Sequence, residues 1–236
     1  MSSAAGSAAE LVARGMEAHL RRVHASLAQG APRAGWKIAL NDPAVQRRLG
    51  LDSSLVAALD GRALLRSGES YRGAAGAHLM AEAEVAVRLA RDLAADASRD
   101  AARAALDAVA PAIELVDYQR PARGLAEILE HGVFHATAIL GAALPLDELP
   151  AIESGLPVLR RNGTTAATPD PALDPGDLIA VVLGAARFLA RHGERLRAGD
   201  WLITGSRVQP VAVAAGDRIE VDFGALGCAS VDIAAA

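Results

Sequence analysis

Two glutamates, Glu82 and Glu84, stand two residues apart inside the otherwise apolar segment 81–87. In a β-strand, residues i and i+2 point to the same face, so the two carboxylates would project side by side. Like charges held that close repel each other unless a cation lies between them, and hard divalent cations such as Mg²⁺ and Mn²⁺ prefer carboxylate oxygens. The pattern indicates either a metal site or the polar face of a solvated edge strand.

A third carboxylate, Glu114, interrupts the aliphatic and β-branched run 109–117, which predicts a buried strand. A carboxylate buried there must be paired or bound to a metal, because burying it alone is expensive. Supplied from a second strand, Glu114 would complete one face of an octahedral site and leave positions for water and substrate. The alternative is a Glu114 that is neutralised by an arginine such as Arg120.

The segment before these glutamates predicts a helix, a strand and a second helix. Residues 7–29 carry apolar side chains at helical spacing, and His19 stands among arginines, where we expect it to be solvated. Residues 35–40 are strand-like and carry Lys37 as their single charge. An aspartate and a proline then start a helix over 44–49. Lys37 therefore lies on a strand shortly before a tight turn, and a lysine that reaches solvent is the alternative to a functional one.

The remainder of the chain predicts strands grouped around isolated helices. Helices are expected over residues 98–108, 123–130 and 178–191, and strands over 157–160, 200–204, 208–213, 218–223 and 228–233. A hairpin turn is expected at Asn162-Gly163, a turn or short helix at 145–157 and a loop at 164–175. Cys228 is expected to be a packed thiol. Strands that do not alternate strictly with helices favour an α+β fold with a mixed, largely antiparallel sheet.

Size and composition exclude several classes of protein. The chain has 236 residues and a net charge of −4, which suits one large domain, alone or with a helical extension, and gives no electrostatic case for a nucleic-acid partner. No uninterrupted apolar segment is long enough to cross a bilayer, and the start lacks the features of a signal peptide. The single cysteine cannot form an internal disulfide. We expect a cytoplasmic protein with neither nucleic-acid nor membrane partners.

Several motifs occur in an order that matches a known family. They are Gly35-Trp36-Lys37-Ile38-Ala39-Leu40, Val45-Gln46, Leu49-Gly50, Glu82-Ala83-Glu84-Val85-Ala86, Pro111-Ala112-Ile113-Glu114-Leu115-Val116-Asp117, Asn162-Gly163, Leu196 to Ser206, Gly216-Asp217-Arg218 and Phe223 to Gly227. Over nearly its whole length the chain resembles the 2-keto-4-pentenoate hydratase and 4-oxalocrotonate decarboxylase family, within the fumarylacetoacetate hydrolase superfamily. The hydrolase branch proper has Asp at the position of Glu114, so the three glutamates favour the hydratase and decarboxylase branch.

The resemblance implies a fold, an assembly and a site. The fold would be an α+β β-roll of the fumarylacetoacetate hydrolase C-terminal type with flanking helices, in which residues 1–60 form an N-terminal helical segment with the lysine strand and residues 61–236 form the catalytic roll, as one structural unit. A homo-oligomer is implied, and a complex with a related enzyme is the alternative. Matching positions make Glu82, Glu84 and Glu114 the ligands of Mg²⁺ or Mn²⁺, and Lys37 the active-site lysine. Substrate contacts are implied for Leu40, Asp117, Thr204, Gly205 and Ser206.

The chain also departs from the family pattern around the predicted metal site. Leu55 stands where the family has an aspartate that works in proton transfer, and 131–135 replaces a polar segment that includes a substrate-contacting serine. His135 could take over as an acid or base near neutral pH, although a packed histidine is the alternative. Tyr118 could donate a hydrogen bond or serve packing. These changes alter the chamber and leave the metal ligands intact.

The predicted chemistry is that of a metal-dependent lyase on a 2-oxo acid or its 2-hydroxydienoate enol, of the kind used in aromatic catabolism. A metal chelated by the 1-carboxylate and 2-oxygen stabilises negative charge on the enolate oxygen, and Lys37 adds charge or moves a proton. Addition of water is the main prediction. Decarboxylation of a 2-oxo-enoic diacid shares the same intermediate and is the close alternative, and a non-catalytic partner or binding subunit is the other.

Overall fold

The computed structural model describes residues 6–119, 121–146 and 156–235. Its centre is a nine-stranded sheet made of β1 (Arg33–Ala39), β2 (Leu55–Asp60), β3 (Leu64–Arg66), β5 (Leu79–Leu89), β6 (Leu106–Asp117), β7 (His135–Leu140), β8 (Leu144–Pro145), β11 (Trp201–Ile203) and β12 (Val211–Ala212). The strand order is β2-β1-β11-β5-β6-β7-β3, with β12 added to β5 and β8 added to β6. Most pairs are antiparallel, whereas β1 with β11 and β3 with β7 are parallel, so the sheet is mixed as predicted.

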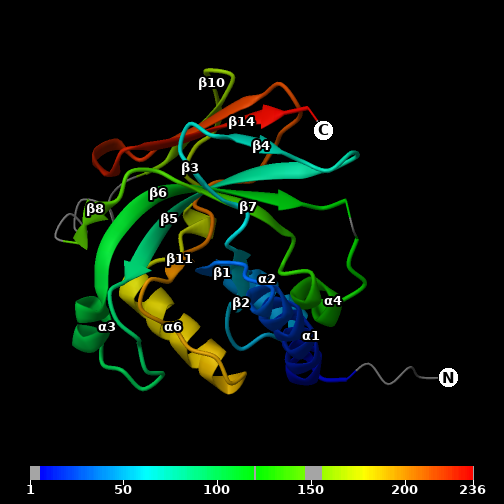
Figure 1. Cartoon of the computed structure of the whole chain (residues 1–236), viewed down its shortest axis with the longest axis vertical. Helices are drawn as coiled ribbons and strands as arrows, with labels where there is room; N and C mark the ends of the chain where they lie inside the picture. The colour runs from blue at the N-terminus through cyan, green and yellow to red at the C-terminus, as the bar shows by residue number, and fades with distance from the viewer. Residues whose placement is uncertain (1–5, 120, 147–155, 236) are drawn as a thin grey trace.

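A second sheet of five strands covers one side of the first. It consists of β4 (Ser70–Arg72), β9 (Val158–Arg161), β10 (Thr164–Ala167), β13 (Arg218–Asp222) and β14 (Cys228–Ala234), in the order β10-β9-β13-β14-β4. Figure 1 shows it above the long strands β5 and β6, and β13 and β14 contact β6. Alternate residues of β13 and β14 are fully buried, and they join the same apolar core as the inner residues of β6.

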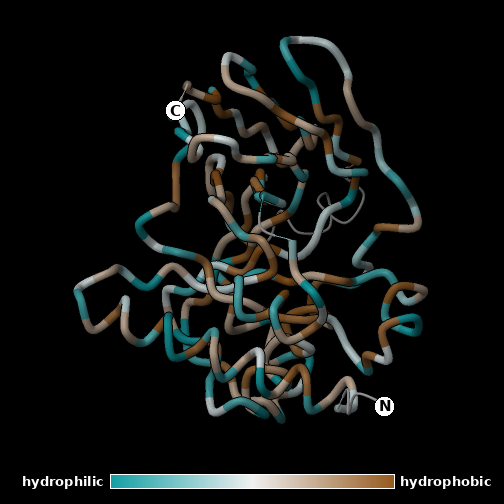
Figure 2. Tube along the Cα trace, turned by 90° about the vertical axis from the view of Figure 1, so that its right-hand side faces the viewer, coloured by the Kyte–Doolittle hydropathy of each residue, from teal (hydrophilic) through white to brown (hydrophobic). Residues whose placement is uncertain are grey.

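The helices lie on the other side of the long strands (Figure 1). They are α1 (Ala8–Ala28), α2 (Pro43–Leu49), α3 (Arg99–Ala105), α4 (Leu125–Glu130) and α6 (Leu178–Arg191). A capping box between Ser7 and Glu10 starts α1, and Asp177 caps α6, whose apolar face includes the buried Phe188. Figure 2 shows hydrophobic residues gathered in the middle of the molecule and hydrophilic ones at its outer turns. No helix among the described residues is both long and apolar enough to span a membrane.

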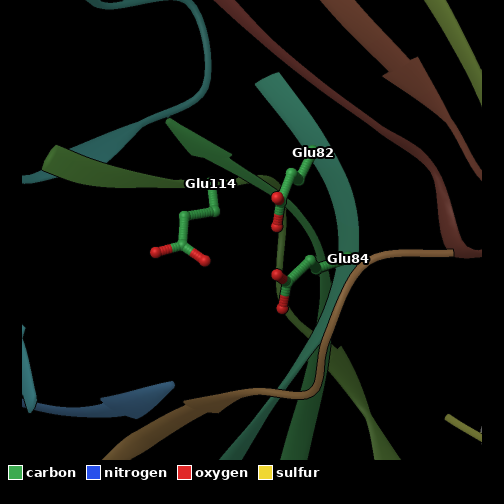
Figure 3. Close-up of side chains that lie close together, drawn as sticks. All are labelled: Glu82, Glu84 and Glu114. Carbon is green, nitrogen blue, oxygen red and sulfur yellow. The ribbon is translucent and has the colours of Figure 1, made fainter. Parts of the chain in front are cut away.

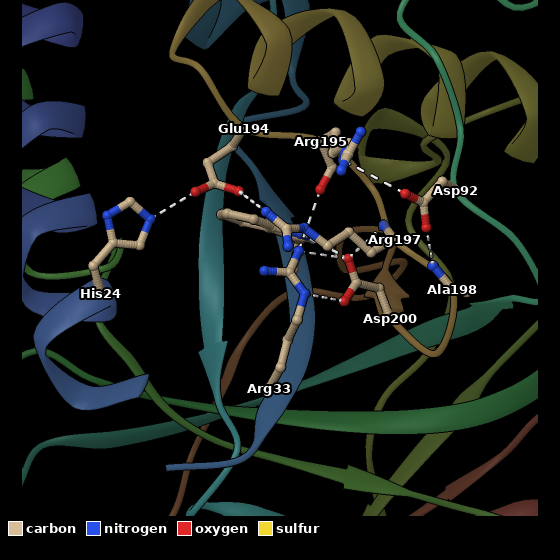
Figure 4. Close-up of polar contacts among 9 residues, drawn as sticks. His24, Arg33, Asp92, Glu194, Arg195, Arg197, Ala198 and Asp200 are labelled. Atoms are coloured by element: carbon tan, nitrogen blue, oxygen red, sulfur yellow. Dashed lines mark hydrogen bonds and ion pairs between the residues drawn. The ribbon is translucent and has the colours of Figure 1, made fainter. Parts of the chain in front are cut away.

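A buried ionic contact fixes the strand that carries Lys37. The carboxylate of Asp200, just before β11, is 1% exposed and accepts hydrogen bonds from Arg33 Nε at 2.6 Å and from Trp36 Nε1 at 3.1 Å (Figure 4). β1 and β11 also approach closely at Gly35, where a Cβ atom would lie 1.9 Å from the Trp201 carbonyl oxygen. Glycine is therefore required at position 35, and β1 is held in one register against the centre of the sheet.

Three predicted elements differ from the structure because tertiary pairing overrides local propensity. The helix predicted over 98–108 ends at Ala105, and β6 begins at Leu106, which pairs with Leu89 of β5. The loop predicted over 164–175 is wrong for its first residues, which form β10 after the left-handed turn at Asn162-Gly163. The strand predicted over 208–213 is reduced to β12, because proline at 210 cannot donate to a ladder.

Other features were missed or lie outside the description. No strand was predicted for β2, β3 or β4. Cys228 is exposed at the start of β14, so the prediction of a packed thiol is wrong, since the residues that alternate with the buried ones on this strand face outward. Most of the turn or short helix predicted over 145–157 falls on residues outside the described ranges, as does Arg120.

Candidate metal centre

Three glutamates from the two central strands form the centre of the site. The register of β5 and β6 places Glu82 directly opposite Glu114, and Glu84 follows Glu82 on the same face. One carboxylate oxygen from each lies within 4.8 Å of the others, and no other group of three or more His, Cys, Asp or Glu in the described part of the chain is so arranged. Figure 3 shows Glu82 and Glu84 directed toward the side chain of Glu114. β5 lies between β11 and β6 in the sheet. The alternative that Glu82 and Glu84 lie on a solvated edge strand is therefore excluded.

Two of these carboxylates have one oxygen held by the protein and the other left without a hydrogen bond. Glu84 Oε2 accepts a hydrogen bond from the Gly205 N–H at 2.7 Å, and Glu114 Oε1 accepts from Lys37 Nζ at 2.7 Å and His135 Nδ1 at 2.8 Å. Glu84 Oε1 and Glu114 Oε2 are buried and hydrogen-bond to no described residue. Because an unpaired buried carboxylate oxygen is costly, these two atoms fit the ligands of a cation.

The charges at the site favour a divalent cation as well. Burial raises the pKa of Glu84 well above its usual value, and the charges of Glu114 and Glu82 raise it further. Burial and the charge of Glu114 raise the pKa of Glu82 to about 7. Burial also opposes ionisation of Glu114, but Lys37 and His135 outweigh it and lower the pKa of this carboxyl. One ammonium thus compensates one carboxylate, and a divalent cation would compensate the other two.

Lys37 is buried at the centre of the site and does not reach solvent. It is 2% exposed, and besides Glu114 its Nζ donates to the Val133 carbonyl at 2.9 Å. Burial acts to lower the pKa of Lys37, but the carboxylates of Glu114 and Glu82 outweigh burial and raise it. The solvent-exposed alternative for Lys37 is therefore wrong, and the side chain is a fixed cation. Glu114 takes Lys37 and His135 as its partners, whereas Arg120 lies outside the described residues.

A strained turn between α4 and β7 supplies the Val133 carbonyl. Gly132, Val133 and Phe134 have φ values of 63°, 52° and 63°, a run of left-handed conformation that is unfavourable for a β-branched residue. His19 of α1 lies against Gly132; its Nε2 accepts from the Ala58 N–H at 2.9 Å, and its ring hydrogen-bonds the Glu130 carbonyl. His19 is 7% exposed, so the prediction that it is solvated is wrong, because α1 packs this side against α4.

A chamber of about 390 Å³ opens beside the glutamates. Lys37 and Glu82 line it together with Leu40, Gly205 and Ser206, three of the predicted substrate contacts. The rest of its wall is formed mainly by apolar side chains of Ile38, Ala39, Val45, Val116, Ile128, Val133, Phe134, Leu173 and Pro210, with Asn41, Asp42, Tyr118 and Gln209 as polar members. The Tyr118 ring packs on Phe134, with their centroids 4.9 Å apart. Asn41 had not been predicted as a site residue.

The other predicted site residues do not line this chamber. Asp117 Oδ1 accepts from the N–H groups of His78 and Gln119, and Thr204 Oγ1 donates to the Val85 carbonyl. His135 lines a separate cavity of about 280 Å³ between α1, the end of β2 and the turn after α4, and it contacts the metal centre through Glu114. Leu55 is buried elsewhere in the core.

The chain is similar to known proteins over most of its length. The chain is 30% identical over 219 residues to TodF product hydratase of Pseudomonas putida strain F1. This alignment covers 89% of this chain and 80% of the relative. It is 24% identical over 204 residues to 4-oxalocrotonate decarboxylase of a Pseudomonas species, covering 86% and 79%. The structure of 4-oxalocrotonate decarboxylase from Pseudomonas putida G7, complexed with magnesium and adipate, matches with a TM-score of 0.84 at 23% identity and covers 93% of this chain and 84% of that one.

The match to a family is equally broad. Residues 14–234 match the fumarylacetoacetate (FAA) hydrolase C-terminal family, so the matched part runs from within α1 to the end of β14 and includes all three glutamates and Lys37. The chain belongs to the fumarylacetoacetate hydrolase family.

Proposed function

We propose that this protein is a metal-dependent lyase that adds water to a 2-hydroxydienoate or the 2-oxo acid formed from it. The observation that carries the proposal is the pair of buried, unpaired oxygens, Glu84 Oε1 and Glu114 Oε2, in a cluster whose other members, Lys37 and Glu82, line a chamber. Its relatives include both a hydratase and a decarboxylase.

Glu82, Glu84 and Glu114 would hold the ion, and three carboxylates without sulfur or imidazole ligands suit Mg²⁺ or Mn²⁺. When bound, such an ion supplies a Lewis acid that stabilises negative charge on the 2-oxygen of the substrate. Lys37 places its ammonium beside the same position, where it attracts the anionic acid and can deliver a proton. His135 holds Glu114 in place and faces away from the substrate chamber.

Water addition is favoured over decarboxylation by the charge of the chamber wall. A 2-oxo-enoic diacid carries a second carboxylate at the end far from the metal, and a buried carboxylate requires a cationic partner. Among the described residues that line the chamber, Lys37 is the only Lys, Arg or His, and it already pairs with Glu114. A substrate with one carboxylate and an uncharged tail therefore fits this wall better. Decarboxylation of a diacid remains the alternative, because two relatives are named 4-oxalocrotonate decarboxylase.

The test is the ultraviolet absorbance of 2-hydroxypenta-2,4-dienoate mixed with the protein, with Mg²⁺, with a chelator, and with the Glu84→Gln variant. The matched control is Asp107→Asn, which removes a carboxylate from an exposed ion pair on β6. We expect Mg²⁺-dependent loss of the dienol band with wild type and the control but not with Glu84→Gln, and a product mass increased by one water. Loss of carbon dioxide from the corresponding diacid would instead support the decarboxylase, and metal binding without turnover of either acid would contradict lyase function.

We further propose that the protein acts in the cytoplasm as a homo-oligomer, with a complex with a related enzyme as the alternative. The homo-oligomer follows from the family resemblance on which the chemistry rests. Light scattering coupled to size-exclusion chromatography would test the assembly, since a monomeric mass at micromolar concentration would contradict it.

A further inference from the structure

We propose that Asn41 is a positioning residue that holds the attacking water, with its side-chain oxygen as the acceptor. Asn41 follows β1 and lines the chamber four residues after Lys37. Its Nδ2 donates a hydrogen bond to the Thr204 carbonyl at 3.1 Å. A carbonyl oxygen can only accept, so this contact fixes which end of the carboxamide faces Thr204 and leaves Oδ1 on the opposite side. This inference rests on the proposed function.

Oδ1 is a buried acceptor that the protein does not satisfy. It hydrogen-bonds to no described residue, although leaving a buried acceptor unpaired is unfavourable. Two other polar side chains that line the chamber have partners, since Ser206 Oγ donates to the Val208 carbonyl and Gln209 Nε2 to Asp170, whereas Tyr118 is exposed. A molecule bound in the chamber could therefore donate a hydrogen bond to Asn41 Oδ1.

The position of Asn41 connects this acceptor to the metal centre. A Cβ atom on Gly205 would lie 1.8 Å from Asn41 Nδ2, so the carboxamide packs directly over this glycine. The N–H group of Gly205 in turn holds Glu84 Oε2 at 2.7 Å. Asn41 thus lies on the Glu84 side of the site and also lines the chamber that would hold the substrate.

Water is the donor that fits this acceptor in the proposed reaction. The carboxylate and 2-oxygen of the substrate are acceptors and face cations, whereas a water molecule has two O–H groups and its lone pair to offer. The water oxygen forms a bond to C4 of the conjugated enone, the C3=C4 electron pair forms a C2=C3 double bond, and the C2=O electron pair moves onto the 2-oxygen. The water loses one proton, C3 gains one as the 2-oxo group forms again, and the net change is addition of H and OH. A neutral amide cannot take the proton, so Asn41 orients the water and is not the base.

The test measures two steps of the reaction on the same substrate. Tautomerisation of the dienol introduces deuterium from D₂O into the recovered 2-oxo acid, whereas hydration gives the hydroxy acid, and NMR follows both. For Asn41→Ala we expect kcat for hydration to fall roughly 10- to 100-fold, as for a misplaced reactant, while deuterium incorporation and Mg²⁺ affinity by calorimetry stay at wild-type values.

The matched control is Gln46→Ala. Gln46 Nε2 donates to the Leu40 carbonyl at 2.7 Å and so anchors the same turn, but Gln46 does not line the chamber. We expect this variant to keep the wild-type ratio of hydration to deuterium incorporation. Hydration by Asn41→Ala at the wild-type rate, an equal loss of both steps, or the same uncoupling in Gln46→Ala would each overturn the role of Asn41. Absence of both steps in wild type would overturn the proposed function, and this inference with it.

Discussion

Acidification should destabilise the protein through His19, the buried imidazole that supports the turn beside Lys37. Burial lowers the pKa of His19 from 6.5 to about 4, although the hydrogen bond to the Glu130 carbonyl opposes this shift. Between these two pH values His19 is protonated in the unfolded chain but neutral in the folded protein. The stabilisation is therefore complete above pH 6.5 and is lost as the pH falls toward 4. A difference of 2.5 pKa units corresponds to about 3 kcal/mol.

The assay is urea unfolding between pH 7.5 and pH 4 for wild type and His19→Gln. Other groups titrate in both proteins, so the informative quantity is the difference between their unfolding free energies. At pH 7.5 wild type should be the more stable, because His19→Gln breaks at least one of two buried hydrogen bonds. By pH 4 this advantage should shrink by about 3 kcal/mol. A constant difference between wild type and His19→Gln would refute the reasoning.

Two substitutions test the packing and charge balance of the centre. Lys37→Met should lower the unfolding free energy by about 3–5 kcal/mol, since it leaves Glu114 charged and buried. The control Arg88→Met should lower it by less than about 1 kcal/mol, because its partner Asp107 is exposed. Equal losses of the two variants in urea unfolding would contradict this prediction. Gly205→Ala should lose about 1–3 kcal/mol and weaken Mg²⁺ binding, because φ is +101° and the new Cβ collides with Asn41. Calorimetry showing wild-type Mg²⁺ affinity would argue against the close packing.

The sequence could single out Glu82, Glu84 and Glu114 as candidate metal ligands, because the spacing of the first two follows the strand period and the third interrupts an aliphatic run. Glu82 and Glu84 must share a face wherever a strand forms, and the aliphatic run around Glu114 required a buried strand. The register that places Glu82 opposite Glu114 could not be derived, because it depends on pairing across the whole length of two strands. The start of β6 shows the same limit: its alanines favour a helix until the partner strand is present.

Residues whose roles depend on contacts between distant segments escaped prediction. His19 is buried only because α1 packs against α4, and the surrounding arginines in the sequence pointed to solvent. Asn41 has no signal beyond its place after the lysine strand, since its orientation comes from the Thr204 carbonyl 163 residues away. Val133 offers only its backbone carbonyl to Lys37, and a backbone contact leaves no mark on residue type.

The most direct test of the account is anomalous diffraction from crystals of the protein grown with Mn²⁺. We expect one strong anomalous peak between Glu82, Glu84 and Glu114. The ion should be bound through Glu84 Oε1 and Glu114 Oε2, while Lys37 and Gly205 keep their hydrogen bonds to the other oxygens. Such a peak would show that the unpaired oxygens are metal ligands. A centre without a peak in crystals that bind Mn²⁺ elsewhere, or with Glu114 turned away from the ion, would contradict the claim that these three glutamates form a metal site.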